Sequence, residues 1–213
     1  MTLVDFSFTP SEYIFLNGEK FSPTSEGAES VFLLCSDTHV NGPQLAMLLV
    51  MGAILANESE GALAIDLQSK KKLFGSTTHE LYLRCVQPTP NWSGYTLEAA
   101  VMFLAGSLYP AQENTLYNII YSLLGDDRMD PWQKIIELVE WGLVSSNWLI
   151  PVKGDAVGAF STPFICPGNV RELALEQPAK PVISLLEMCK QRRPELWQRM
   201  TREIERAFRD RKR

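Results

Sequence analysis

The feature that most constrains the fold is an uninterrupted apolar run at residues 45–56, which carries no charged or strongly polar side chain. A surface helix shows a polar face every third or fourth residue, so this segment must be covered on all sides. The run is shorter than the ~20 residues needed to cross a bilayer, which favours a buried core helix. Asn41-Gly42-Pro43 supplies a helix start, and Gly52 or Asn57 supplies a stop.

The length of 213 residues predicts one domain with ample chain for a single core. The content of 46% hydrophobic and 21% charged residues is ordinary for a globular protein. Asp5 interrupts the N-terminus, and no cationic segment precedes an apolar run as it would in a signal peptide. We therefore expect a cytoplasmic protein, associated with a membrane at most peripherally.

Several segments around the apolar run have clear local patterns. Residues 25–35 place glutamates before an apolar end, which predicts a helix with a buried last turn. Residues 13–21 fit either a hairpin around Asn17-Gly18 or a short helix capped by Gly18. Strand formers at 62–67 and 80–86 flank a polar stretch at 68–78, which predicts a hairpin. Further helices are predicted at 96–104 and 115–124.

Residues 131–142 give the clearest amphipathic helix, with Asp130 as N-cap, Pro131 in the first turn and Gly142 at the end. Extended segments at 143–152 and 157–166 follow it and predict a second hairpin. Each unit thus runs helix, glycine, hairpin, as winged-helix domains do. The predicted fold is a mainly α single domain, residues 1–213, with two small β-hairpins and a basic C-terminal helix.

The C-terminal segment differs in charge from the rest of the chain. Residues 190–213 carry ten basic and four acidic side chains (+6), whereas residues 1–189 carry ten basic and 21 acidic ones (−11). A helix is predicted from Pro194 to about Arg209, because apolar residues recur every fourth position at Leu196, Met200, Ile204 and Phe208. We expect this segment, 191–213, to dock on the acidic body or to form a dimer contact.

Motifs for catalysis, metal binding or cofactor binding are absent from the sequence. His39 and His79 stand apart from any carboxylate or cysteine spacing that would form a dyad or a metal site. No glycine-rich phosphate loop or hydrolase motif occurs. The four cysteines show no C-x-x-C spacing, so we expect buried, reduced thiols. The expectation is a protein that is not an enzyme and has no cofactor.

The candidates for binding an anion are basic side chains. Three lysines lie together in the predicted hairpin loop, and four arginines lie just before or on the predicted C-terminal helix: Lys70, Lys71, Lys72, Arg192, Arg193, Arg199 and Arg202. Lysines in a mobile loop can meet phosphates as point charges. An anionic lipid headgroup is one partner that such residues would recognise.

Four short motifs occur in order at 28–34 (AESVFLL), 48–54 (LLVMGAI), 93–100 (SGYTLEAA) and 138–144 (LVEWGLV). Together they resemble the Golgi phosphoprotein family of phosphatidylinositol-4-phosphate-binding adaptors, in the manner of its bacterial members, over about residues 26–152. The family typically has arginine on both sides of the first glycine, where this chain has Met51 and Ala53 beside Gly52. Its later arginines would fall near Pro131 and Gln133, so no phosphate-binding residue carries over.

These observations favour a non-catalytic binding or adaptor protein, peripheral at an anionic, phosphoinositide-type membrane surface. The alternative is a winged-helix-like protein that binds nucleic acid through its hairpins or its C-terminal helix. A protein partner, including a second copy of the chain through the C-terminal helix, stays open.

Overall fold

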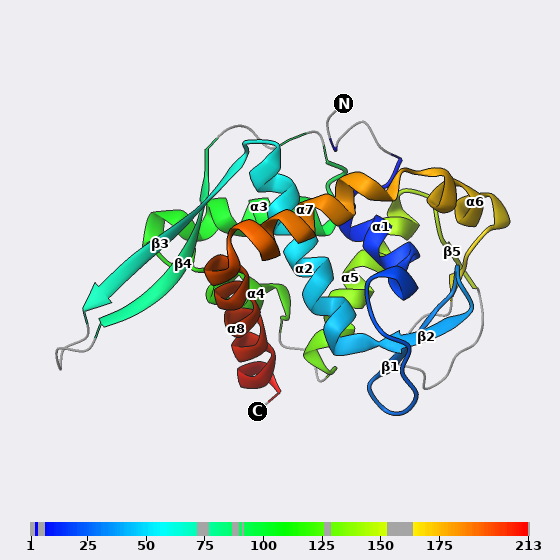
Figure 1. The fold of residues 1–213 in the computed structure, drawn as a ribbon, viewed down its shortest axis with the longest axis horizontal. Helices are drawn as coiled ribbons and strands as arrows, with labels where there is room; N and C mark the ends of the chain where they lie inside the picture. Colours follow the sequence, from blue (N-terminus) through cyan, green and yellow to red (C-terminus); the bar gives the residue numbers. More distant parts are fainter. Residues whose placement is uncertain are drawn as a thin grey trace.

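The computed structural model describes residues 3, 7–71, 77–86, 90, 92–125, 129–152 and 164–212. Within these residues the chain is mainly α, with eight α-helices and three two-stranded antiparallel sheets (Figure 1). The helices are α1 (Pro10–Leu16), α2 (Gly42–Ser59), α3 (Leu97–Leu108), α4 (Leu116–Leu123), α5 (Pro131–Ser145), α6 (Gly168–Glu176), α7 (Ala179–Arg192) and α8 (Pro194–Arg211). The sheets pair β1 (Ser30–Leu33) with β2 (Thr38–Asn41), β3 (Leu63–Lys71) with β4 (Thr77–Cys85), and β5 (Ile150–Pro151) with β6 (Phe164–Ile165).

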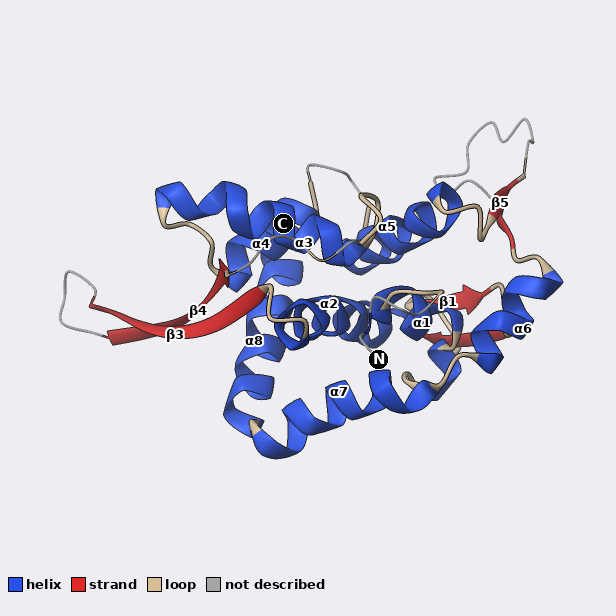
Figure 2. Cartoon of the chain, turned by 90° about the horizontal axis from the view of Figure 1, so that it is seen from above, coloured by secondary structure: helices blue, strands red, loops and turns tan. Residues whose placement is uncertain are grey.

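The apolar run forms the central helix α2, as predicted. The Asn41 side chain caps it by accepting a hydrogen bond from the Gln44 backbone N–H at 2.9 Å. The helix contacts α1, α3, α5, α7 and α8, and Figure 2 shows it between a layer of α3, α4 and α5 and the crossing α7. Its residues 45–57 are buried except Met47, which packs partly buried against the core, so burial on all sides is confirmed.

Gly142 was predicted to end its helix, and either Gly52 or Asn57 was predicted to end α2; neither glycine is a helix end. α2 continues to Ser59 and α5 continues to Ser145. A Cβ on Gly52 would lie 2.6 Å from Ile14 Cδ1, and a Cβ on Gly142 would lie 2.9 Å from the Tyr95 carbonyl oxygen. Each glycine therefore allows another element to approach closely, rather than supplying a left-handed helix end.

The helix predicted at 25–35 is also wrong, because residues 30–33 form strand β1 and pair with β2. Val31 lies opposite Val40, and Leu33 lies opposite Thr38. Asp37, with φ of 52°, supplies the left-handed residue of the turn between the strands. A short apolar run fits a strand as well as a helix, and here the β-branched and aromatic residues prevail.

The region 13–21, left open between a hairpin and a helix, lies in α1 and a following 3-10 turn at Gly18–Lys20. Thr9 and Glu12 form a reciprocal capping box at the start of α1. The predicted hairpin of β3 and β4 is confirmed, with strands longer than expected, and it projects from the helical body in Figure 1. The described residues of the second predicted hairpin pair Ile150 with Ile165 and Pro151 with Phe164. Residues 153–163, expected to contain its turn, lie outside the described residues.

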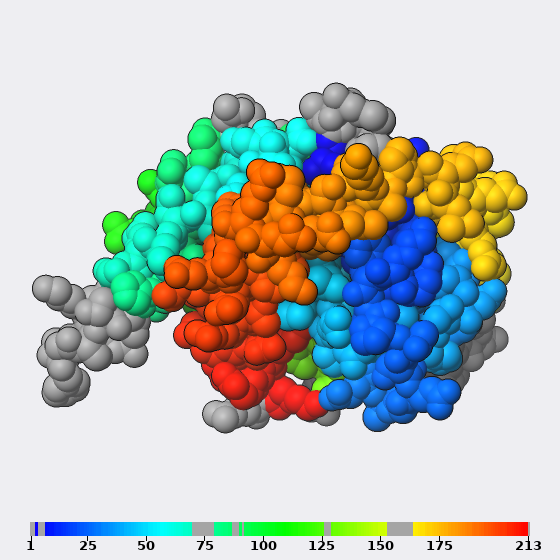
Figure 3. Space-filling view, viewed as in Figure 1, coloured from blue at the N-terminus to red at the C-terminus, as the bar shows by residue number. Residues whose placement is uncertain are grey.

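Helices α6 and α7 were not predicted, whereas α8 forms close to its predicted bounds. α8 packs against α4, α7, α5 and α2. Its Glu203 is buried and accepts hydrogen bonds from the backbone N–H groups of Leu81 and Tyr117, both at 3.2 Å. Arg206 lies over the Tyr117 ring at 4.0 Å. The C-terminal helix is therefore docked on the body, as expected, and Figure 3 shows it beside α7 on the surface.

The expectation of reduced thiols is wrong for two of the four cysteines. Cys35, just after β1, forms a disulfide with Cys166, just after β6, across a sequence separation of 131. Cys85 is an exposed free thiol and Cys189 a buried one. Disulfides persist mainly in oxidising compartments, and the expected cytoplasmic location stays a prediction. Among the described residues, no helix combines the length and hydropathy that a membrane span requires.

Candidate anion-binding groove

A groove lies where the body end of the β3–β4 hairpin meets the junction between α7 and α8, with a volume of about 470 Å³. Figure 3 shows the junction and the hairpin side by side on one face of the molecule. We call it the arginine groove, because three arginines and four aliphatic side chains line it together with Pro194 and Glu195. Its arginines are Arg192, Arg193 and Arg199, and its aliphatic residues are Ile65, Leu67, Leu81 and Leu196.

The hairpin supplies most of the apolar wall. Ile65 and Leu67 are two residues apart on β3, so their side chains point to the same face of the strand. Leu67 pairs with Leu81 across the hairpin, and Leu81 is buried whereas Leu67 is 51% exposed. An aliphatic side chain as exposed as Leu67, next to a cavity, is a surface that a ligand could cover.

The junction between α7 and α8 supplies the charges. Pro194 has no backbone N–H to donate and suits the first position of a helix, so α7 ends at Arg192 and α8 begins at Pro194. Arg192 is in the last turn of α7, where a cation is favoured by the helix dipole. Arg199 follows in the second turn of α8 and is half-buried. The sharp turn thereby brings both arginines to one groove.

Arg193 is held in place by Glu58 near the end of α2. Its Nη1 and Nη2 atoms donate to Glu58 Oε1 and Oε2 at 2.7 and 2.6 Å. These hydrogen bonds raise the pKa of Arg193, so the guanidinium keeps its charge. Among the described residues, Arg192 and Arg199 form no ion pair with any carboxylate. With Glu195 and Glu58 counted against the three arginines, the groove carries a net charge of +1.

The structure therefore brings together three of the seven predicted basic residues. Arg202 is exposed on α8 but does not line the groove. Lys70 and Lys71 lie at the outer end of β3, opposite Thr78 and Thr77. Lys72 lies outside the described residues.

The apolar residues of the groove were missed by the sequence analysis. Ile65, Leu67 and Leu81 were assigned only to a hairpin, because their distance in sequence from the arginines gives no hint of contact. One sequence feature pointed to an apolar wall at this position, namely Leu67 just before the polar stretch of the hairpin.

Among the described residues, no group of three or more histidine, cysteine, aspartate or glutamate side chains could hold a metal ion. His79 Nδ1 lies 2.9 Å from Ser69 Oγ, and His39 packs on the Phe32 ring at a centroid distance of 5.1 Å.

No protein-family model, curated protein sequence or solved structure matches this chain.

Proposed function

We propose that the chain is a non-catalytic binding protein whose arginine groove holds the phosphate-bearing headgroup of an anionic lipid at a membrane surface. The observation that carries this proposal is the groove itself, where Arg192 and Arg199 form no ion pair with any described carboxylate and lie beside exposed Leu67. Guanidinium groups bind phosphate through paired hydrogen bonds, and adjacent aliphatic side chains suit the apolar part of the same lipid.

The charge distribution supports the same proposal. The positive C-terminal segment covers one part of a chain whose remainder is strongly negative. A localised positive surface on an acidic body orients the protein, because an anionic membrane attracts one face and repels the others. The resemblance of the four short motifs to the Golgi phosphoprotein adaptors points to the same ligand class, although the groove uses different residues.

The alternative, nucleic-acid binding by winged-helix units, has less support. A winged-helix protein places an exposed recognition helix in the major groove before its hairpin. Here the helix before the β3–β4 hairpin is α2, which is almost entirely buried. The first helix–hairpin unit therefore has no exposed recognition helix, and in the second unit the described residues of β5 and β6 form only two residue pairs.

Sedimentation with lipid vesicles tests the proposal. Vesicles containing a phosphoinositide or another anionic phospholipid should retain the protein at least ~tenfold more than neutral vesicles, and retention should weaken as salt is added. Duplex DNA at the same ionic strength should retain little. Equal retention on neutral and anionic vesicles, or stronger retention on DNA, would contradict the proposal.

A further inference from the structure

A second pocket, about 330 Å³ in volume, lies between β1 and α5. We call it the aromatic pocket, since four aromatic residues line it together with two glutamates: Phe32, Trp132, Trp141, Phe164, Glu137 and Glu140. Its volume is at the lower end of the range for small-molecule sites. None of the described residues that line the pocket is an arginine or a lysine.

The helix α5 is built to present these side chains. Ile135, Val139 and Leu143 are buried in the core on one side of the helix. Trp132, Glu137, Glu140 and Trp141 line the pocket from neighbouring turns. The Trp141 and Phe164 rings meet edge to face, with centroids 5.8 Å apart and planes at 82°. Two aromatic rings at this angle form adjacent walls rather than a closed stack.

The two glutamates differ in their environment. Glu137 Oε2 accepts a hydrogen bond from Lys134 Nζ at 2.8 Å, which balances its charge. Glu140 is half-buried, and among the described residues no cation pairs with it. Burial, together with the nearby Glu137, raises the pKa of Glu140 to about 7. Among the described residues, the pocket thus holds one carboxyl group with no cation beside it, and about half of these groups are ionised at neutral pH.

We propose that the aromatic pocket binds an organic ammonium ion, with methylated ammonium groups such as that of choline as the preferred class. The face of an aromatic ring attracts a cation, and tryptophan does so most strongly. A methylated ammonium presents no N–H donors that would need several acceptors, so aromatic walls and one carboxylate match it. A bound monocation would also favour the ionised form of Glu140, whereas a phosphate would be repelled by it.

This site is independent of the arginine groove. The groove is lined by β3, β4, α7 and α8, and the aromatic pocket by β1, α5 and β6 with neighbouring residues, so the two share no lining residue. The ammonium could belong to a soluble amine or to a choline lipid headgroup. The chemistry of recognition is the same in both cases, and the test separates the two sources.

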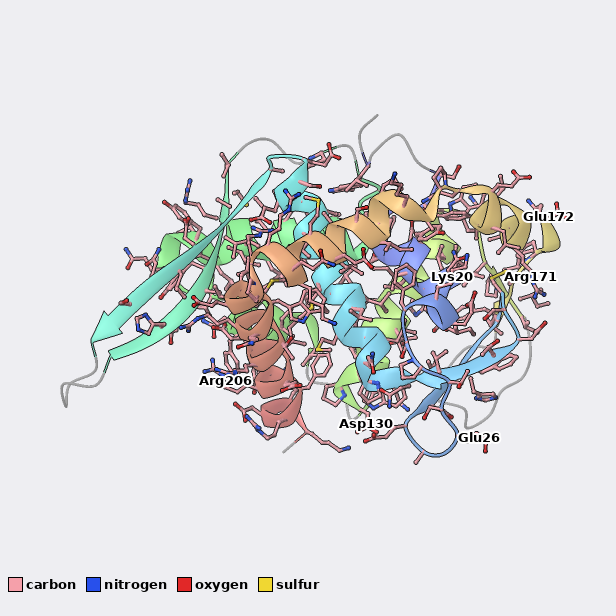
Figure 4. The ribbon with its side chains drawn as sticks, viewed as in Figure 1. Lys20, Glu26, Asp130, Arg171, Glu172 and Arg206 are labelled. Atoms are coloured by element: carbon pink, nitrogen blue, oxygen red, sulfur yellow. A yellow bond between two sulfur atoms is a disulfide. The ribbon has the colours of Figure 1, made fainter. Side chains whose placement is uncertain are left out.

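The test is a titration of the full chain with choline chloride, in which calorimetry and tryptophan fluorescence detect binding. Sodium chloride is the salt control. The uncharged carbon isostere dimethylbutanol tests whether charge is needed. Glu140→Gln keeps the shape of the side chain, and Trp141→Leu keeps apolar bulk without the ring. Glu172→Gln is the matched control, because Glu172 lies on α6 near one end of the molecule, away from α5 (Figure 4).

We expect choline to bind and dimethylbutanol to bind at least ~tenfold more weakly. Glu140→Gln and Trp141→Leu should each weaken choline binding by a similar factor, and Glu172→Gln should leave it unchanged. Retention on phosphatidylcholine vesicles that Glu140→Gln abolishes would assign the ammonium to a lipid, and binding of free choline alone would assign it to a soluble amine. Absence of both kinds of binding, or equal binding of choline and dimethylbutanol, would overturn the proposal.

Choline binding in the aromatic pocket can be tested separately from lipid binding in the arginine groove. Arg192→Glu should leave choline binding unchanged, because Arg192 does not line the aromatic pocket. Loss of choline binding in that variant would show that the pocket does not act alone and would overturn the assignment.

Discussion

Arg193 and Glu58 form a two-point ion pair, with N–O distances of 2.7 and 2.6 Å, that ties the α7–α8 junction to the end of α2. The pair joins the C-terminal segment to the central helix at the edge of the arginine groove. The pair also neutralises Arg193, one of the three groove arginines, so removing the Glu58 charge should make the groove more positive.

Glu58→Gln should strengthen retention on anionic vesicles several-fold, because it leaves Arg193 positive and uncompensated in the groove. One basic residue near an anionic surface contributes about 1 kcal/mol. The free energy of unfolding should fall by no more than about 1 kcal/mol, since the pair is partly exposed and surface ion pairs contribute little. Vesicle sedimentation and urea denaturation measure the two effects. Weaker retention in Glu58→Gln would show that Arg193 must be fixed by Glu58 to bind.

The Cys35–Cys166 disulfide should contribute substantially to stability. It closes a loop across a sequence separation of 131, for which the chain-entropy account gives about 5 kcal/mol as an upper value. Urea denaturation with and without a thiol reductant measures the difference. A Cys35→Ser/Cys166→Ser double variant should be less stable and insensitive to reductant, whereas Cys85→Ser, at an exposed free thiol, should behave like the parent chain. A parent chain unaffected by reductant would contradict the prediction.

The helical glycines should differ in their tolerance of a methyl group. Gly142→Ala should cost about 1–3 kcal/mol, because its Cβ would meet the backbone oxygen of Tyr95 at 2.9 Å. Gly52→Ala should cost less, since the 2.6 Å contact there is with the end of the flexible Ile14 side chain. Gly106→Ala is the matched control, and it should stabilise α3 by up to about 1 kcal/mol because the nearest atom is 3.8 Å away. Thermal unfolding measures the stability of the three variants. A Gly142→Ala variant more stable than the Gly106→Ala variant would contradict the prediction.

Gly52 and Gly142 illustrate what a local sequence pattern cannot predict. A glycine after an apolar stretch looks like a helix end, and only the position of Ile14 or Tyr95 reveals that it permits close contact. The central helix, by contrast, was predictable because an apolar run without a polar face has few alternatives. Docking of α8 was predictable for a similar reason, since its four-residue apolar spacing needs a surface to cover it.

The arginine groove and the disulfide depend on contacts between distant residues. Arg192 and Arg199 could be proposed from charge alone, but their apolar neighbours come from a hairpin more than 100 residues earlier. Pairing of Cys35 with Cys166 likewise cannot be deduced from spacing. The strand β1 was missed because its apolar residues fit helix and strand equally well in isolation.

Stability should depend on pH through Glu12, which is buried at the start of α1. Burial, with repulsion from Glu98 and despite hydrogen bonds from Thr9, raises the pKa of Glu12 from 4.5 to about 7. The folded chain then holds this proton more tightly than the unfolded chain. The stabilisation is therefore complete below about pH 4.5 and is lost as the pH rises to about 7, by about 3 kcal/mol in total.

Glu12→Gln removes this titration while keeping an acceptor for the Thr9 backbone N–H, which lies 2.9 Å from Glu12 Oε2. The variant should gain stability relative to the parent as the pH rises from 4.5 to 7. Urea denaturation across that range measures the difference. A constant difference between the two proteins would show that Glu12 does not titrate there.

Charge reversal within and outside the arginine groove tests the central claim most directly. Arg192→Glu/Arg199→Glu changes two groove residues, and Arg202→Glu/Arg209→Glu makes the same change of net charge on α8 outside the groove. Figure 4 places Arg206, which lies between the two control positions in sequence, on the same helix α8. With about 1 kcal/mol per basic residue, the groove pair should lower retention on phosphoinositide vesicles at least ~thirtyfold, and the control pair should lower it much less. An equal loss in both double variants would show that overall charge, not the groove, binds the membrane.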